Sequence, residues 1–140
     1  MSTEQTASLP VRKRPLSIWL LCIANGLLAI MLIGTSLTAE RFGYTLGQAI
    51  FAGVIGLGIS ISAHLTWYGK RYGRNVLLAL LTAFFGLLLA QSAMTIAWAI
   101  EVDYEGLYLT RAIAWGVFSV VWLAVNYWFL FGRRARAFYA

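Results

Sequence analysis

Four long apolar runs dominate the sequence, over residues 16–38, 46–68, 76–100 and 107–131. Each run is longer than the roughly 20 residues that an α-helix needs to cross about 30 Å of hydrocarbon. Hydrophobic residues make up 61% of the 140 residues and charged residues only 11%, against about 25% charged residues in a typical soluble domain. The sequence therefore predicts an all-α integral membrane protein, a single four-helix bundle built from two helical hairpins.

The distribution of Lys and Arg predicts how this bundle is threaded. The end that carries both termini has nine cations: Arg12, Lys13, Arg14, Lys70, Arg71, Arg74, Arg133, Arg134 and Arg136. The opposite end has two cations and four acids: Arg41, Arg111, Glu40, Glu101, Asp103 and Glu105. Because short loops rich in Lys and Arg stay in the cytoplasm, we expect both termini to be cytoplasmic and loops 39–45 and 101–106 to face outward.

Short tails flank the four predicted helices. Residues 1–15 form a basic cytoplasmic tail that we expect to be disordered at its start, and residues 132–140 form a second basic tail. In that second tail, Arg133, Arg134 and Arg136 either contact anionic lipid headgroups or only fix the topology, which is the interpretation we favour. The net charge of +6 does not indicate a nucleic-acid partner, because the basic residues form short clusters beside apolar runs.

Small residues recur along the second run. Ala52, Gly56 and Ser60 follow one another at intervals of four residues, which is the spacing of one helix face. In lipid, small residues let two helix backbones approach closely. The row predicts a helix-packing face, either within the bundle, which we favour, or against another copy of the chain.

Three polar side chains fall well inside the runs. Asn25, His64 and Asn126 all lie in the half of the bundle near the termini, so a closed bundle brings them into one polar cluster. Polar groups at this depth need partners. The cluster is either a small ligand site or a set of interhelical hydrogen bonds, and we favour the hydrogen bonds.

The sequence gives no sign of a cofactor, a metal site or catalytic residues. The chain has one His and one Cys, whereas a zinc site usually takes four ligands or three and a water, and a haem normally takes a second strong axial ligand. No Ser/His/Asp or Cys/His pairing indicates hydrolysis. One turn inside the last helix, Arg111 is expected to form an ion pair at the outer rim with one of three acids: Glu101, Asp103 or Glu105.

Two stretches at the ends of the bundle carry a resemblance. The stretch Arg14–Leu21 opens the first run, and Asn126–Phe131 followed by Arg134–Tyr139 closes the last one. Both resemble the ends of small four-span bacterial inner-membrane proteins of uncharacterised function. The resemblance implies a bacterial inner membrane, and it implies no activity, cofactor or site residue.

These observations favour a non-enzymatic accessory or scaffold protein that works as a homo-oligomer or beside a larger membrane partner. The alternative is a small transporter or permeability factor with a polar path near Asn25, His64 and Asn126. The size and helix count are those of the small multidrug resistance exporters, which carry a glutamate in their first helix. Here no Asp or Glu lies inside any span. A third class, a sensor or immunity-type protein, would have to recognise its ligand through two short outer loops.

Overall fold

The structure, a computed structural model, describes residues 15–43, 45–102 and 106–139. In chain order its elements are α1 (Leu16–Leu37), the 3₁₀ helix η1 (Ala39–Phe42), α2 (Leu46–Trp67), α3 (Arg71–Glu101), α4 (Leu107–Phe131) and α5 (Arg133–Tyr139). Four of the helices are long and apolar enough to cross a membrane. The prediction of an all-helical fold with four long apolar helices is confirmed.

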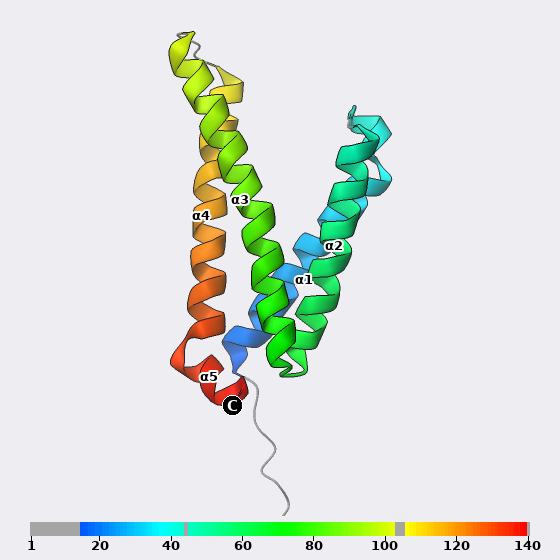
Figure 1. The fold of residues 1–140 in the computed structure, drawn as a ribbon, viewed down its shortest axis with the longest axis vertical. Coiled ribbons are helices and arrows are strands. Elements are labelled where there is room, and N and C mark those ends of the chain that lie inside the picture. Colours follow the sequence, from blue (N-terminus) through cyan, green and yellow to red (C-terminus); the bar gives the residue numbers. More distant parts are fainter. Residues whose placement is uncertain (1–14, 44, 103–105, 140) are drawn as a thin grey trace, which may run out of the picture.

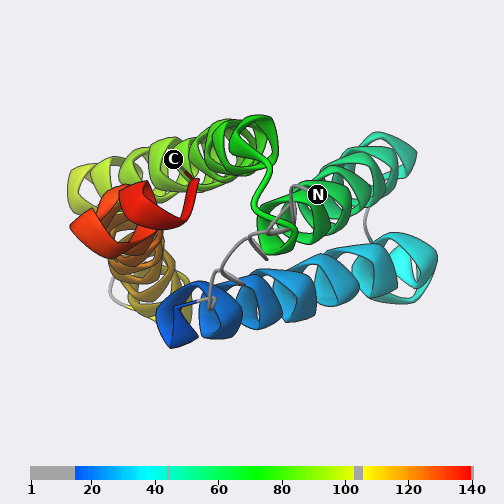
Figure 2. The ribbon, with the colours of Figure 1, turned by 90° about the horizontal axis from the view of Figure 1, so that it is seen from below.

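The four long helices form two hairpins that diverge. Helix α1 packs along α2, α3 packs along α4, and α2 and α3 join the two hairpins, whereas α1 and α4 touch only briefly. Figure 1 shows that the hairpins meet where α1 begins and α5 lies, and that they separate towards the other end. Figure 2 shows the same divergence from below. We call the end where the hairpins meet the terminal end. The opposite end, where η1 lies and α3 ends, is called the loop end.

The outer surface of the helices is apolar. Large hydrophobic side chains are exposed along all four of them, and Leu37, Leu46 and Trp128 are each more than three-quarters exposed. Monomeric soluble proteins rarely expose continuous apolar surface on this scale. The exterior is therefore compatible with that of a multi-pass membrane protein.

The closest approach of α1 and α2 occurs at two glycines of α2. A Cβ atom at Gly56 would lie 3.0 Å from the carbonyl oxygen of Ala29, and one at Gly53 would lie 2.8 Å from the Oγ of Ser36. Of the row predicted in this helix, Gly56 is buried, Ala52 is half-buried and Ser60 is exposed. The contact face therefore runs through Gly53 and Gly56 and not along the whole predicted row.

A tight turn ends α2 and sets the start of α3. The amide of Lys70 bonds the carbonyl of Leu65 and the amide of Gly69 bonds that of Thr66, with Gly69 at a φ of 75°. This is the Schellman arrangement, in which glycine tolerates the left-handed conformation. Because the turn takes only three residues, α3 begins at Arg71, five residues before the apolar run from which its start was predicted.

The interior is apolar and centres on α3. Phe85, Leu81 and Leu77 of that helix are fully buried, and they pack with residues such as Ile59 of α2 and Leu130 of α4. At the terminal end a second cluster joins Ile18 and Cys22 to Ala135 and Tyr139 of α5. The two hairpins are therefore held together mainly in their terminal half.

We expect Gly56→Val to destabilise the bundle more than Gly26→Val does. Both changes replace a glycine by the same β-branched residue inside a helix, but a Cβ atom at Gly26 has no neighbour within 4 Å. Overpacking of a filled contact costs about 1–3 kcal/mol. Unfolding of the two variants in mixed micelles measures the difference, and equal stability would contradict the close α1–α2 contact.

Candidate functional site

The two hairpins are joined by a buried amide pair between α1 and α4. The Nδ2 of Asn25 donates to the Oδ1 of Asn126 over 2.7 Å, and both side chains are fully buried. The two residues are 101 positions apart in the sequence. Among apolar side chains the two amides stay paired, because separating them would leave each amide as an unpaired polar group.

Trp122 completes this junction. Its indole Nε1 donates to the Oδ1 of Asn25 over 3.3 Å, and the Nδ2 of Asn126 donates back to the Trp122 carbonyl over 2.9 Å. Within the described part of the chain, every buried side-chain N or O atom has a hydrogen-bond partner. The junction is therefore a closed set of hydrogen bonds.

Two buried serine hydroxyls bond within their own helices. Ser62 donates to the Gly58 carbonyl over 2.6 Å, and Ser119 donates to the Trp115 carbonyl over 2.7 Å. Such bonds satisfy a hydroxyl without another helix. They leave Asn25, Trp122 and Asn126 as the polar contact between α1 and α4.

His64 does not join the amide pair. Its side chain is exposed on α2, and its ring makes an edge-to-face contact with Tyr68, with 4.8 Å between ring centroids. Of the three residues predicted to cluster, the structure thus brings together Asn25 and Asn126 and leaves His64 on the outside of the bundle.

An apolar groove lies beside the amide pair, between α1 and α4. Its volume is about 500 Å³. Helix α4 contributes Ala114, Trp115, Phe118 and Trp122, and α1 contributes residues between Ala24 and Met31. Trp122 takes part in the amide junction and also lines the groove. The junction therefore limits the groove on the side of the terminal end. No pattern in the sequence indicates this groove, because the groove depends on the angle between the two hairpins.

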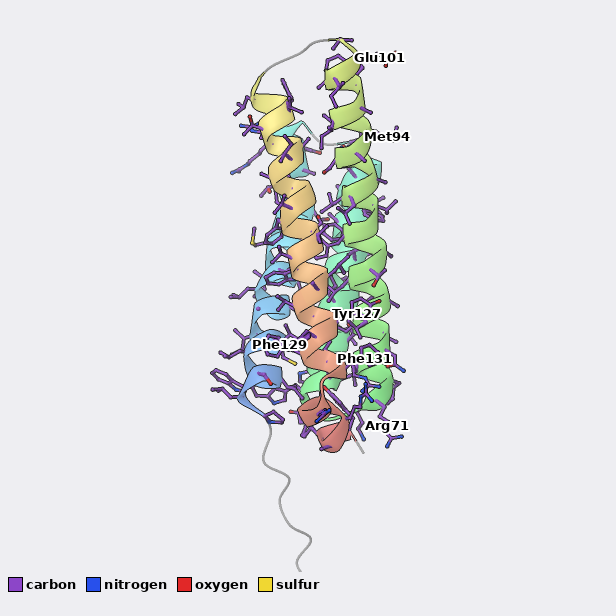
Figure 3. All side chains as sticks on the ribbon, turned by 90° about the vertical axis from the view of Figure 1, so that its left-hand side faces the viewer. Arg71, Met94, Glu101, Tyr127, Phe129 and Phe131 are labelled. Carbon is purple, nitrogen blue, oxygen red and sulfur yellow. The ribbon has the colours of Figure 1, made fainter. Side chains whose placement is uncertain are left out.

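The predicted ion pair at the loop end falls partly outside the described residues, since these do not include Asp103 and Glu105. Arg111 is exposed on the second turn of α4, and Glu101 is exposed at the last residue of α3. Figure 3 shows Glu101 at the loop end of α3, on the side away from α1. Arg111 lies three residues before Ala114, the first residue of α4 that lines the groove.

The segment predicted as a basic tail folds into α5 and packs under the bundle. The Oη of Tyr139 donates to the carbonyl of Thr66 over 3.2 Å, and the Nε of Arg71 donates to the carbonyl of Tyr139. Figure 3 shows Arg71 at the terminal end of the bundle, where α5 lies. Ala135, Phe138 and Tyr139 are spaced three and four residues apart, which is a helical signal that the basic residues obscured.

Arginine side chains lie on α5 and next to it. The guanidinium of Arg74 lies 5.0 Å from the centroid of the Tyr139 ring and 4.9 Å from that of Phe131. Arg133 is exposed, and Arg136 is exposed with its Nε bonded to the Phe131 carbonyl over 3.0 Å. The side chain of Arg134 lies outside what the structure describes. Burial raises the pKa of Tyr139 above its usual value, while the positive charge of Arg74 opposes the rise.

Among the residues searched, which are the described ones, no group of three or more His, Cys, Asp or Glu side chains lies close enough to hold a metal ion. Comparison of the chain with protein-family models, curated proteins and solved structures finds no match. The site must therefore be interpreted from its own geometry, that is, from a closed amide junction with an apolar groove beside it.

We expect the effects of Asn25→Leu and Asn126→Leu on stability to be strongly non-additive. Asn25→Leu alone leaves the Oδ1 of Asn126 and the Nε1 of Trp122 without their partner, and a buried unpaired group costs about 1–3 kcal/mol. The double variant removes both amides and should lose less than the sum of the single losses. A double-mutant cycle in mixed micelles measures the coupling, expected at about 0.6 kcal/mol or more.

The matched cycle pairs Asn25→Leu with Ser119→Ala, since Ser119 bonds only within its own helix. That pair should be additive. Additivity in the asparagine cycle as well would contradict the amide junction.

We expect Tyr139 to titrate above pH 10, the usual value for a tyrosine. A raised pKa means that the folded state favours the neutral phenol, so the docking of α5 is complete below pH 10 and weakens as the pH rises beyond it. Ultraviolet titration of the wild type minus that of Tyr139→Phe isolates this group. A midpoint at or below 10 would show that the ring is not buried under the bundle.

Proposed function

We propose that this protein is a non-enzymatic accessory or scaffold subunit of a bacterial inner membrane, which works by lateral association with another copy or with a larger membrane protein. The observation that carries the proposal is the closed junction of Asn25, Asn126 and Trp122. It uses the polar groups inside the bundle to join its own hairpins. What is left for other molecules is the outer surface of the helices.

The same junction argues against a polar path for a solute. A transport pathway through a membrane protein needs polar groups that face a water-filled cavity or the bundle interior. Asn25 and Asn126 are fully buried and bond to each other, and His64 faces outward. A solute entering at this level would have to break hydrogen bonds between the hairpins.

The back of α3 offers a surface for association. Along the side opposite its buried residues, small side chains recur at intervals of four and three residues: Ala79, Ala83, Gly86, Ala90, Ala93 and Ala97. The five alanines are exposed, and a Cβ atom at Gly86 would have no neighbour within 4 Å. Small residues allow close backbone contact between helices in lipid. Gly53 and Gly56 of α2 are not available for this purpose, because α1 covers them.

The charge distribution supports the cytoplasmic placement of both termini. The terminal end carries the described cations Lys70, Arg71, Arg74, Arg133 and Arg136. Short segments with such an excess of Lys and Arg remain in the cytoplasm. In this orientation α5 lies at the headgroup level of the inner leaflet, with Arg133 and Arg136 exposed to anionic lipid.

Blue-native electrophoresis in mild detergent should show the protein in a species larger than the monomer. Ala83→Phe combined with Ala90→Phe should lower the amount of that species, because bulky side chains keep the backbones apart. Ile30→Phe is the matched control, since Ile30 is exposed on α1. A wild type that migrates only as a monomer, with no co-purifying protein, would contradict the proposal.

Reconstituted liposomes distinguish a scaffold from a permeability factor. The wild type should release small trapped solutes no faster than empty liposomes do, because the junction is closed. Release by the wild type that disappears in the double variant Asn25→Leu/Asn126→Leu would favour the transporter and contradict the scaffold.

A further inference from the structure

The groove between α1 and α4 accepts only an apolar occupant. None of its lining side chains carries a charge, an amide or a hydroxyl, and the indole N–H of Trp122 is already bonded to Asn25. A polar solute would lose its hydrogen bonds to water there without replacement. The surrounding bilayer, in contrast, supplies apolar chains at every position along the helices.

Stacked rings hold the α4 wall of the groove in shape. Phe118 stacks on Trp122 with 5.5 Å between centroids and meets Trp115 edge to face at 5.8 Å. From behind, the buried ring of Phe85 contacts Phe118 at 5.9 Å. Because the rings support one another, the wall stays formed without an occupant.

The groove lining on α4 runs from Ala114 to Trp122, which is about 12 Å along a helix, and Arg111 lies one turn further towards the loop end. Arg111 and Trp122 are eleven residues apart on α4, which corresponds to about 16 Å along a helix. Half of a hydrocarbon core of about 30 Å is roughly 15 Å. The amide pair closes the groove at the level of Trp122, near the middle of the membrane, and its other limit lies at Met31 and Ala114, one turn short of Arg111.

One cation, Arg111, lies next to that other limit, at an end of the bundle where acids outnumber cations in the sequence. Arg111 precedes Ala114 and Trp115 by three and four residues, so it lies on the face of α4 that lines the groove. The N-terminus of α4 has no side-chain cap, and its dipole favours an anion. Glu101, the acid at the end of α3, lies on the side of that helix away from α1 (Figure 3).

We propose that the groove binds one acyl chain of an anionic phospholipid from the leaflet at the loop end, with the lipid phosphate at Arg111. The distance of about one leaflet from Arg111 to the amide pair, with an apolar lining between them, matches a phospholipid in both length and chemistry. A partner helix fits less well, because six of the eight lining side chains are rings or long side chains, whereas close helix contacts use small residues. The lipid would fill the gap that the diverging hairpins leave.

Quenching of tryptophan fluorescence by brominated acyl chains tests this proposal on the full chain. The protein is reconstituted in vesicles that contain brominated phosphatidylglycerol or, separately, brominated phosphatidylcholine. The quenching that is lost in Trp115→Phe reports the groove. We expect phosphatidylglycerol to compete for this position roughly fivefold better than phosphatidylcholine, the effect of one cation near a membrane surface.

Arg111→Gln should abolish this preference and Arg111→Lys should retain it. Arg41→Gln is the matched control, because Arg41 is an exposed cation at the same end but on η1. Ala114→Phe, which fills the groove, should lower the quenching of Trp115 by both lipids. Circular dichroism and elution volume show whether each variant is folded.

Equal quenching by the two lipids in the wild type would overturn the proposal. So would a preference that Arg41→Gln abolishes as fully as Arg111→Gln does, because this would indicate a general surface potential. Disulfide trapping between two copies that carry Leu27→Cys, in a Cys22→Ser background, would show that a second copy covers the groove, and this would also overturn the proposal.

Discussion

The hydrogen bond between Asn25 and Asn126 is the contact on which the arrangement of the two hairpins depends. In lipid, apolar surfaces gain little from meeting one another, because acyl chains are as apolar as leucine. Helix α1 has an extensive neighbour in α2 and α4 has one in α3, but α1 and α4 touch only briefly. A buried amide pair can fix such a contact, since separating the helices would leave both amides without partners in hydrocarbon. The hairpins accordingly meet at this level and diverge beyond it (Figure 1).

Contacts of α5 hold the helices together at the terminal end. There α5 folds back beneath α4, and Tyr139 reaches the last turn of α2 while its carbonyl accepts a bond from the first turn of α3. Arg74 adds a cation over the ring. These contacts join three helices at the terminal end, which in the proposed orientation lies at the level of the headgroups. The amide pair and α5 together restrain one half of the bundle and leave the other half open to lipid.

This division gives each surface of the molecule a different part in the proposed function. The closed junction accounts for Asn25 and Asn126, the back of α3 offers small residues to another helix, and the groove between α1 and α4 offers an apolar space to a lipid. The lipid inference does not require the scaffold role, since lipid selectivity and oligomeric state are measured independently. A bound lipid would also explain how a bundle with diverging hairpins keeps a filled interface with the membrane.

The sequence alone determined the four apolar helices and the all-helical class, because the length of a span and its hydropathy are local properties that lipid imposes. It also indicated that Asn25 and Asn126 need partners, because polar groups at depth are costly wherever the chain leads. Only the tertiary structure decided that they bond to each other and that His64 faces outward, since rotation of each helix about its axis follows from packing at contacts such as Gly56. The docking of α5 and the groove were likewise beyond the sequence. Both depend on where helices distant in the chain meet, and hydropathy does not encode the angle between two hairpins.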